Sequence, residues 1–98
     1  MEVEKVDWRK IELEWDSQKS REVKLRRGVS LEEIVALIRR GKVLAFIKHH
    51  NQRKYPNQYF IVVDVEGYPW AVASEFRGNK LRLITAFPAR KFKRLTGK

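Results

Sequence analysis

The sequence predicts a small α+β domain in which two helices precede an antiparallel sheet. Three observations indicate this class. Apolar residues recur at helical spacing between positions 31 and 38, later segments are rich in β-branched and aromatic residues, and short glycine-containing turns separate those segments. The chain has 98 residues, of which 43 % are hydrophobic, enough for one modest core. We therefore expect a single domain over residues 1–98.

The first expected element is a strand from Trp8 to Trp15, where polar and apolar residues alternate. A strand with this alternation turns Ile11, Leu13 and Trp15 inward. It places Trp8 on the opposite, polar face, together with charged neighbours.

Two helices are expected next. Asp16 is suited to cap a basic surface helix over Ser17–Arg27, which Gly28 would end. Ser30 and Glu33 form a capping box at the start of the second helix, which we expect to end before a glycine at position 41. The inward stripe of this second helix consists of Leu31, Ile34, Val35, Leu37 and Ile38.

Four strands and a tail helix complete the chain. We expect strands at Val43–Lys48, Tyr59–Val65, Tyr68–Phe76 and Lys80–Phe87, and a short basic helix at Ala89–Leu95. Regular alternation in the last strand places Leu81, Leu83 and Thr85 on one face and Arg82, Ile84 and Ala86 on the other. The order of elements is thus β-α-α-β-β-β-β with a short C-terminal helix.

The charge of the chain is strongly positive and unevenly spread. Lys and Arg number 22 against 12 Asp and Glu, a formal net charge of +10. The first sixteen residues carry a net −3, whereas Lys80–Lys98 contains seven bases and no acid. A small domain this basic favours a polyanionic partner, either nucleic acid or an acidic protein. The simpler alternative is a charged surface that only keeps the protein in solution.

Composition also bounds the compartment. The chain has no cysteine, which excludes a disulfide framework and a thiolate zinc site and favours the reducing cytoplasm. No apolar run approaches the length of a membrane span, and Met1–Lys10 lacks the apolar core of a signal peptide. We expect a cytoplasmic protein without a membrane partner.

The residues contain no metal or cofactor motif. The two histidines, His49 and His50, are adjacent, and no glycine-rich phosphate loop is present. We therefore expect no cofactor. Cleavage of RNA is compatible with such a chain, since the 2′-hydroxyl of the substrate is the nucleophile and the protein need only orient the backbone, move protons and stabilise charge.

The candidate catalytic residues gather around one predicted hairpin. We expect Glu75 to transfer a proton, and Arg77, Arg82 and Arg90 to bind the scissile phosphate. His49 is a further candidate acid or base, because histidine titrates near neutrality. Judged from spacing alone, the commoner explanation for such a hairpin is a cross-strand ion pair on a solvated sheet face.

Two further segments are candidates for RNA contact. The polar loop at residues 49–58 offers Lys54 for phosphate and Tyr55 for stacking on a base. The tail offers Lys91, Lys93 and Arg94 around an apolar Phe92. Each segment also has a simpler interpretation. The first is an ordinary polar surface loop, and the second is a solvated C-terminal turn.

The order of motifs resembles that of BrnT-type toxins. The N-terminal half has Glu14-Trp15-Asp16, Lys19 and then Arg27-Gly28-Val29-Ser30-Leu31-Glu32-Glu33, similar to the E-W-D and G-[VI]-S-F-E-E motifs of that family. The C-terminal half has Glu75, Arg77-Gly78, the run from Arg82 to Ala86, and Arg90-Lys91, similar to its E-x-R-G and R-[IL]-I-S-A-R-x-A motifs. Leu31 stands in place of phenylalanine, and Phe87-Pro88 is an insertion before the last arginine. The loop that ends in Tyr55-Pro56-Asn57-Gln58 resembles a divergent branch of the family rather than its central form.

The resemblance implies a RelE-like fold and a type II toxin that cleaves RNA and so inhibits translation. It also implies an antitoxin partner of the ribbon-helix-helix class, through which the complex would bind operator DNA. Two other functions remain open at this point: a non-catalytic RNA- or DNA-binding module, and an interaction domain that only docks an antitoxin. Fragmentation of RNA in the presence of EDTA would separate the toxin from both.

Overall fold

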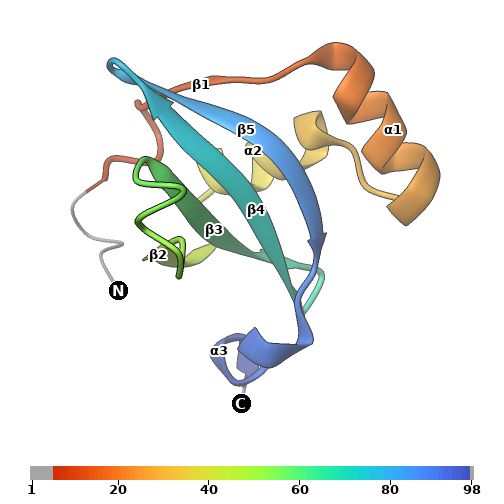
Figure 1. Cartoon of the computed structure of the whole chain (residues 1–98). Helices are drawn as coiled ribbons and strands as arrows, with labels where there is room; N and C mark the ends of the chain where they lie inside the picture. The colour runs from red at the N-terminus through yellow and green to blue at the C-terminus, as the bar shows by residue number, and fades with distance from the viewer. Residues whose placement is uncertain (1–5, 98) are drawn as a thin grey trace.

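The computed structural model of the protein describes residues 6–97 and confirms the predicted class and order of elements (Figure 1). The elements in chain order are β1 (Glu12–Glu14), α1 (Ser17–Arg27), α2 (Leu31–Arg39), β2 (Val43–Lys48), β3 (Gln58–Val65), β4 (Tyr68–Arg77), β5 (Lys80–Pro88), a 3-10 turn η2 (Arg90–Phe92) and α3 (Arg94–Gly97). The first strand is much shorter than predicted, and the tail helix predicted at Ala89–Leu95 is instead the turn η2 followed by the short helix α3. The boundaries of the elements from α1 to β5 fall within two residues of the predicted ones.

The five strands form one sheet in the order β1-β5-β4-β3-β2. The four strands from β2 to β5 are antiparallel to their neighbours, as predicted, but β1 runs parallel to β5. The sheet is therefore mixed. A parallel pair needs a long crossover between its strands, and here the two helices and three strands between β1 and β5 form it.

The segment before β1 departs from the predicted alternation. The backbone N–H groups of Lys10 and Ile11 both donate to the carbonyl of Asp7, at 3.0 and 2.9 Å, so the chain makes a turn there. The turn directs Trp8 into the core, where its ring packs edge-on against Phe46 with 5.0 Å between centroids. The predicted outward orientation of this tryptophan was wrong. The residues predicted to face inward do pack against the core, namely Ile11, Leu13 and Trp15.

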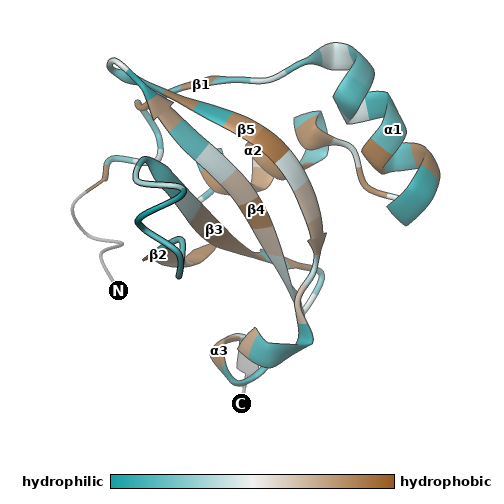
Figure 2. Ribbon diagram, viewed as in Figure 1, coloured by the Kyte–Doolittle hydropathy of each residue, from teal (hydrophilic) through white to brown (hydrophobic). Residues whose placement is uncertain are grey.

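The two helices begin and end at the predicted signals. The Asp16 carboxylate accepts from the backbone N–H of Gln18 at 2.8 Å, and Gly28 ends α1 in the left-handed conformation with φ 87°. The Ser30 hydroxyl accepts from the backbone N–H of Glu33 at 3.0 Å at the start of α2. α2 is strongly amphipathic, with Leu31, Ile34 and Ile38 buried, and it lies behind the sheet in the view of Figure 1. α1 is almost wholly polar and lies beside β5 (Figures 1 and 2).

A β-bulge interrupts the pairing of β4 with β5. Ser74 lies opposite Leu83, and the residue before it in β4, Ala73, lies opposite Thr85. Ile84 of β5 is therefore the extra residue. The regular alternation predicted for this strand was therefore wrong beyond the bulge. Ala86 faces the core instead of Thr85 and is fully buried.

The face of the sheet opposite α2 is called the open face here. In Figure 1 it faces the viewer, and within residues 6–97 no helix stands in front of β4 and β5. At the far end of the sheet η2 and α3 pack against β4. In the described part of the chain no helix is long and apolar enough to cross a membrane.

Candidate functional site

A row of polar side chains crosses the open face at the end where β4 turns into β5. Glu14 lies opposite Arg82, Arg82 lies opposite Glu75, and Glu75 lies opposite Gln58. His49 continues the row, because its backbone N–H donates to the carbonyl of Gln58 at 2.8 Å. These five residues are called the polar row. It brings together three of the predicted site residues, which come from β5, β4 and the end of β2.

The arginine of the polar row pairs with β1. Its guanidinium lies 4.0 Å from the carboxylate of Glu14, and both side chains are about one-third exposed, with 32 and 33 % of their surface accessible. An ion pair this exposed contributes little to stability. In this arrangement the Arg82 guanidinium lies toward Glu14. Glu75 is half-buried, and its carboxylate has no ion pair among residues 6–97. Glu75 is therefore able to accept a proton or a hydrogen bond from a ligand.

His49 is oriented by the loop that follows it. Its Nδ1 accepts from the backbone N–H of Asn51 at 3.0 Å, so the neutral ring carries its proton on Nε2. Burial, and then the neighbouring charge of His50, lower the pKa of His49 below its ordinary value of 6.5. At neutral pH the ring is thus uncharged and presents an N–H donor.

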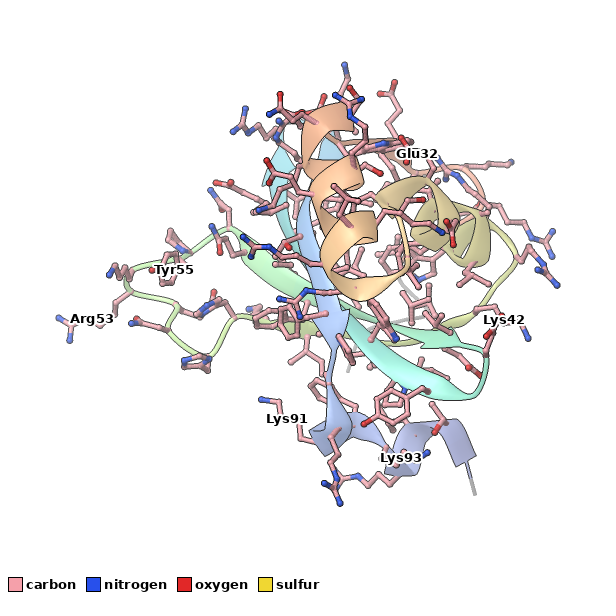
Figure 3. The ribbon with its side chains drawn as sticks, turned by 90° about the vertical axis from the view of Figure 1, so that its right-hand side faces the viewer. Glu32, Lys42, Arg53, Tyr55, Lys91 and Lys93 are labelled. Atoms are coloured by element: carbon pink, nitrogen blue, oxygen red, sulfur yellow. The ribbon has the colours of Figure 1, made fainter. Side chains whose placement is uncertain are left out.

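The loop between β2 and β3 carries two of the predicted RNA contacts. Tyr55 packs on His49 with 4.5 Å between ring centroids, and the ammonium of Lys54 lies 5.5 Å from the centroid of the Tyr55 ring. Backbone bonds close the loop, with the N–H of Tyr55 donating to the carbonyl of Asn51 at 2.9 Å. Figure 3 shows Arg53 and Tyr55 projecting from this loop beyond the sheet. The structure therefore places Lys54 and Tyr55 beside the His49 end of the polar row.

Arg77 lies at the tip of the hairpin between β4 and β5, opposite Lys80. The tip is a two-residue turn whose first residue, Gly78, has φ 61°. Arg77 is exposed and is two residues beyond Glu75 on the same strand. It stands near the polar row but is not part of it.

The remaining predicted residues gather at the opposite end of the sheet. Arg90 follows β5, and the seven residues from Arg82 to Pro88 extend over roughly 20 Å of strand. Near Arg90 the Lys93 ammonium lies 4.8 Å from the centroid of the Tyr68 ring. Figure 3 shows two of these tail lysines projecting in different directions. Arg90, Lys91, Lys93 and Arg94 are all exposed and do not join the polar row.

A network of hydrogen bonds connects the end of β1, next to Glu14, to the two helices. The indole N–H of Trp15 donates to the carboxylate of Glu32 at 3.0 Å, and the Ser20 hydroxyl donates to the same carboxylate. The Ser20 oxygen also accepts from the backbone N–H of Leu31 at 2.9 Å. The bonds from Ser20 and then Trp15 lower the pKa of Glu32 below its ordinary value. These three residues tie β1, α1 and α2 together.

Two members of the polar row, Glu14 and Gln58, were not among the predicted site residues. Glu14 belongs to the row only because β1 pairs parallel with β5, a long-range pairing that no local pattern indicates. Gln58 could have been found, since it begins a strand whose next residues are strongly β-forming, and the hairpin pairs it with Glu75.

Within residues 6–97 no group of three or more His, Cys, Asp or Glu side chains is arranged to hold a metal ion. The geometry instead combines the carboxylate of Glu75, which has no ion pair in the described residues, with an arginine and a histidine on the open face. Comparison of the chain with protein-family models, curated proteins and solved structures gives no match.

Proposed function

We propose that the protein binds RNA on the open face of its sheet and cleaves it, without a metal ion, at the polar row. The observation that carries the proposal is the carboxylate of Glu75, which has no ion pair in the described chain and lies opposite Arg82 in a protein of net charge +10. The positive charge attracts the phosphate backbone, and the polar row supplies groups for proton transfer and charge stabilisation.

The chemistry follows from the substrate. Glu75 would accept the proton of a 2′-hydroxyl, whose oxygen then attacks the adjacent phosphorus and displaces the 5′-oxygen of the next nucleotide. The phosphorus–5′-oxygen bond breaks, and the departing oxygen takes up a proton from water, so the products are a 2′,3′-cyclic phosphate and a free 5′-hydroxyl. Arg82 would stabilise the charge of the phosphorane as it forms.

Two other residues assist this step in the proposal. His49 lies two strand spacings, about 10 Å, from Glu75 along the polar row. Its Nε2–H would hydrogen-bond to the phosphate or to the departing oxygen. Arg77 would hold the neighbouring phosphate. Arg90 and the tail bases would contact RNA at the other end of the sheet.

From the resemblance to BrnT-type toxins we propose that this activity belongs to a toxin–antitoxin system. An acidic antitoxin of the ribbon-helix-helix class would mask the toxin in the cytoplasm and carry the complex to operator DNA. α1 suits the docking of such a partner. It carries five bases and one acid, and its Leu25, 87 % exposed, offers an apolar anchor among them.

The test is incubation of the purified protein with RNA in EDTA, comparing wild type with Glu75→Gln and Arg82→Ala. The wild type should yield fragments with cyclic phosphate ends. Removal of a proton-transfer group lowers such rates about 10²–10⁴-fold. Glu75→Gln should therefore slow cleavage by such a factor while RNA is still bound.

Glu66→Gln is the matched control, because Glu66 is an exposed turn residue at the other end of β4. It should cleave like the wild type. Equal cleavage by Glu75→Gln would overturn the catalytic assignment. RNA that is retarded but intact with the wild type would favour a non-catalytic binding module, and no retardation would favour a domain that only docks a protein.

A further inference from the structure

A row of rings crosses the open face beside the polar row and shares His49 with it. The rings of Tyr55 and His49 are 4.5 Å apart between centroids, those of His49 and Phe60 are 5.4 Å apart, and those of Phe60 and Phe87 are 6.3 Å apart. The four residues come from the loop before β3, the end of β2, β3 and β5. They are called the ring row.

The ring row stands above a floor of small residues. Phe60 lies opposite Ala73 of β4, and Phe87 lies opposite Ala71 of the same strand. The β-bulge of β5 is what turns Phe87 to this face, since regular alternation from the inward Leu83 would direct it into the core. All four rings are only half-buried, so each keeps part of its surface accessible to a ligand.

Cations lie at both ends of the ring row. The guanidinium of Arg27 on α1 lies 5.9 Å from the centroid of the Phe87 ring. At the other end the ammonium of Lys54 lies 5.5 Å from the centroid of the Tyr55 ring. A ligand that covered the rings would therefore meet positive charge at each end. Accessible rings bordered by cations suit a polyanion that carries aromatic groups, which is the chemistry of a nucleic acid strand.

We propose that the ring row is a stacking platform for unpaired nucleobases, so that the RNA bound on the open face is single-stranded. This inference rests on the proposed function and names its substrate class. The bases of a duplex are stacked on each other and closed to protein rings, whereas unpaired bases can lie on them. From β2 to β5 the row crosses three strand spacings, about 14 Å, which accommodates two or three bases. The neighbouring polar row would then face the backbone of the same strand.

Binding of a labelled oligoadenylate tests the platform, with the same strand annealed to oligouridylate as the duplex. Phe60→Leu and Phe87→Leu each remove one ring and keep an apolar side chain. Loss of one base-to-ring stack should weaken binding roughly 5- to 150-fold. Phe92→Leu is the matched control, because Phe92 is a half-buried tail residue outside the ring row, and it should bind like the wild type.

A spectroscopic signal separates stacking from a loss of folding. An oligonucleotide containing 2-aminopurine should lose fluorescence on binding the wild type, keep it with Phe87→Leu, and lose it again with Phe87→Tyr, which restores a ring. Equal affinity of Phe60→Leu and Phe87→Leu for the single strand would overturn the platform, and so would equally tight binding of the duplex by the wild type. If these variants still bind and cleave RNA like the wild type, the platform fails while the proposed function stands. If the wild type neither binds nor cleaves RNA, the proposed function fails.

Discussion

Replacement of Ser20 by alanine tests how the helices are fixed to β1. The Ser20 side chain is buried, with 1 % of the residue exposed, and its oxygen is the acceptor for the backbone N–H of Leu31 in a buried bond of 2.9 Å. In Ser20→Ala that N–H, at the start of α2, has no acceptor and no access to water. An unpaired buried donor costs about 1–3 kcal/mol. For a chain of this size, ~2 kcal/mol lowers the melting temperature by roughly 8–16 °C.

Thermal unfolding followed by circular dichroism measures the effect. Ser17→Ala, an exposed change on the same helix, is the control and should stay within about 0.5 kcal/mol of the wild type. Glu32→Ala removes the carboxylate that accepts from the Ser20 hydroxyl, so the double variant should lose less stability than the sum of the two single variants. An unchanged melting temperature for Ser20→Ala, or strict additivity, would refute the reasoning.

Three other predictions follow from titration and backbone geometry. Hydrogen bonds from Ser20 and Trp15 lower the pKa of Glu32, and Lys24 lowers that of Glu33, so both carboxylates stabilise the fold above the unfolded pKa of about 4.3. Resistance to urea should thus fall as the pH drops below that value, and a flat profile would contradict this. By NMR the pKa of His49 should lie below 6.5 and rise in His50→Ala, because a neighbouring charge is removed; no rise would contradict the stated cause. Gly67→Ala should cost about 1 kcal/mol, because φ is 86° there, and unchanged stability would contradict it.

Most of the fold could be predicted because its signals are local. The capping residues Asp16 and Ser30 mark the helix starts, and Gly28 marks a helix end, all from interactions within a few residues. The segment before β1 could not be predicted in the same way. Trp8 enters the core because the chain turns at Asp7. The alternation of polar and apolar residues in the same segment is equally typical of a strand, so the sequence does not indicate the turn.

Only the part of the candidate site that lies on one hairpin could be predicted from the sequence. Glu75 and Arg82 are opposite each other because a short turn joins their strands, so the spacing in the sequence fixes their pairing. Glu14 reaches Arg82 through a parallel pairing between distant parts of the chain, which no spacing indicates. Arg90 is close to the hairpin in sequence, but the length of β5 carries it to the far end of the sheet.

The bulge in β5 shows why a one-residue irregularity matters more for the open face than for the core. On the core side the bulge turns Ala86 inward in place of Thr85, so a side chain still fills that position of the core. On the open side the same shift brings out Phe87, and only this orientation lets its ring meet Phe60 and lie under Arg27. A strand with unbroken alternation would turn the Phe87 ring to the core side and leave the open face with no ring on β5. The proposed stacking of bases therefore depends on a backbone feature that hydrophobic periodicity, by its nature, cannot indicate.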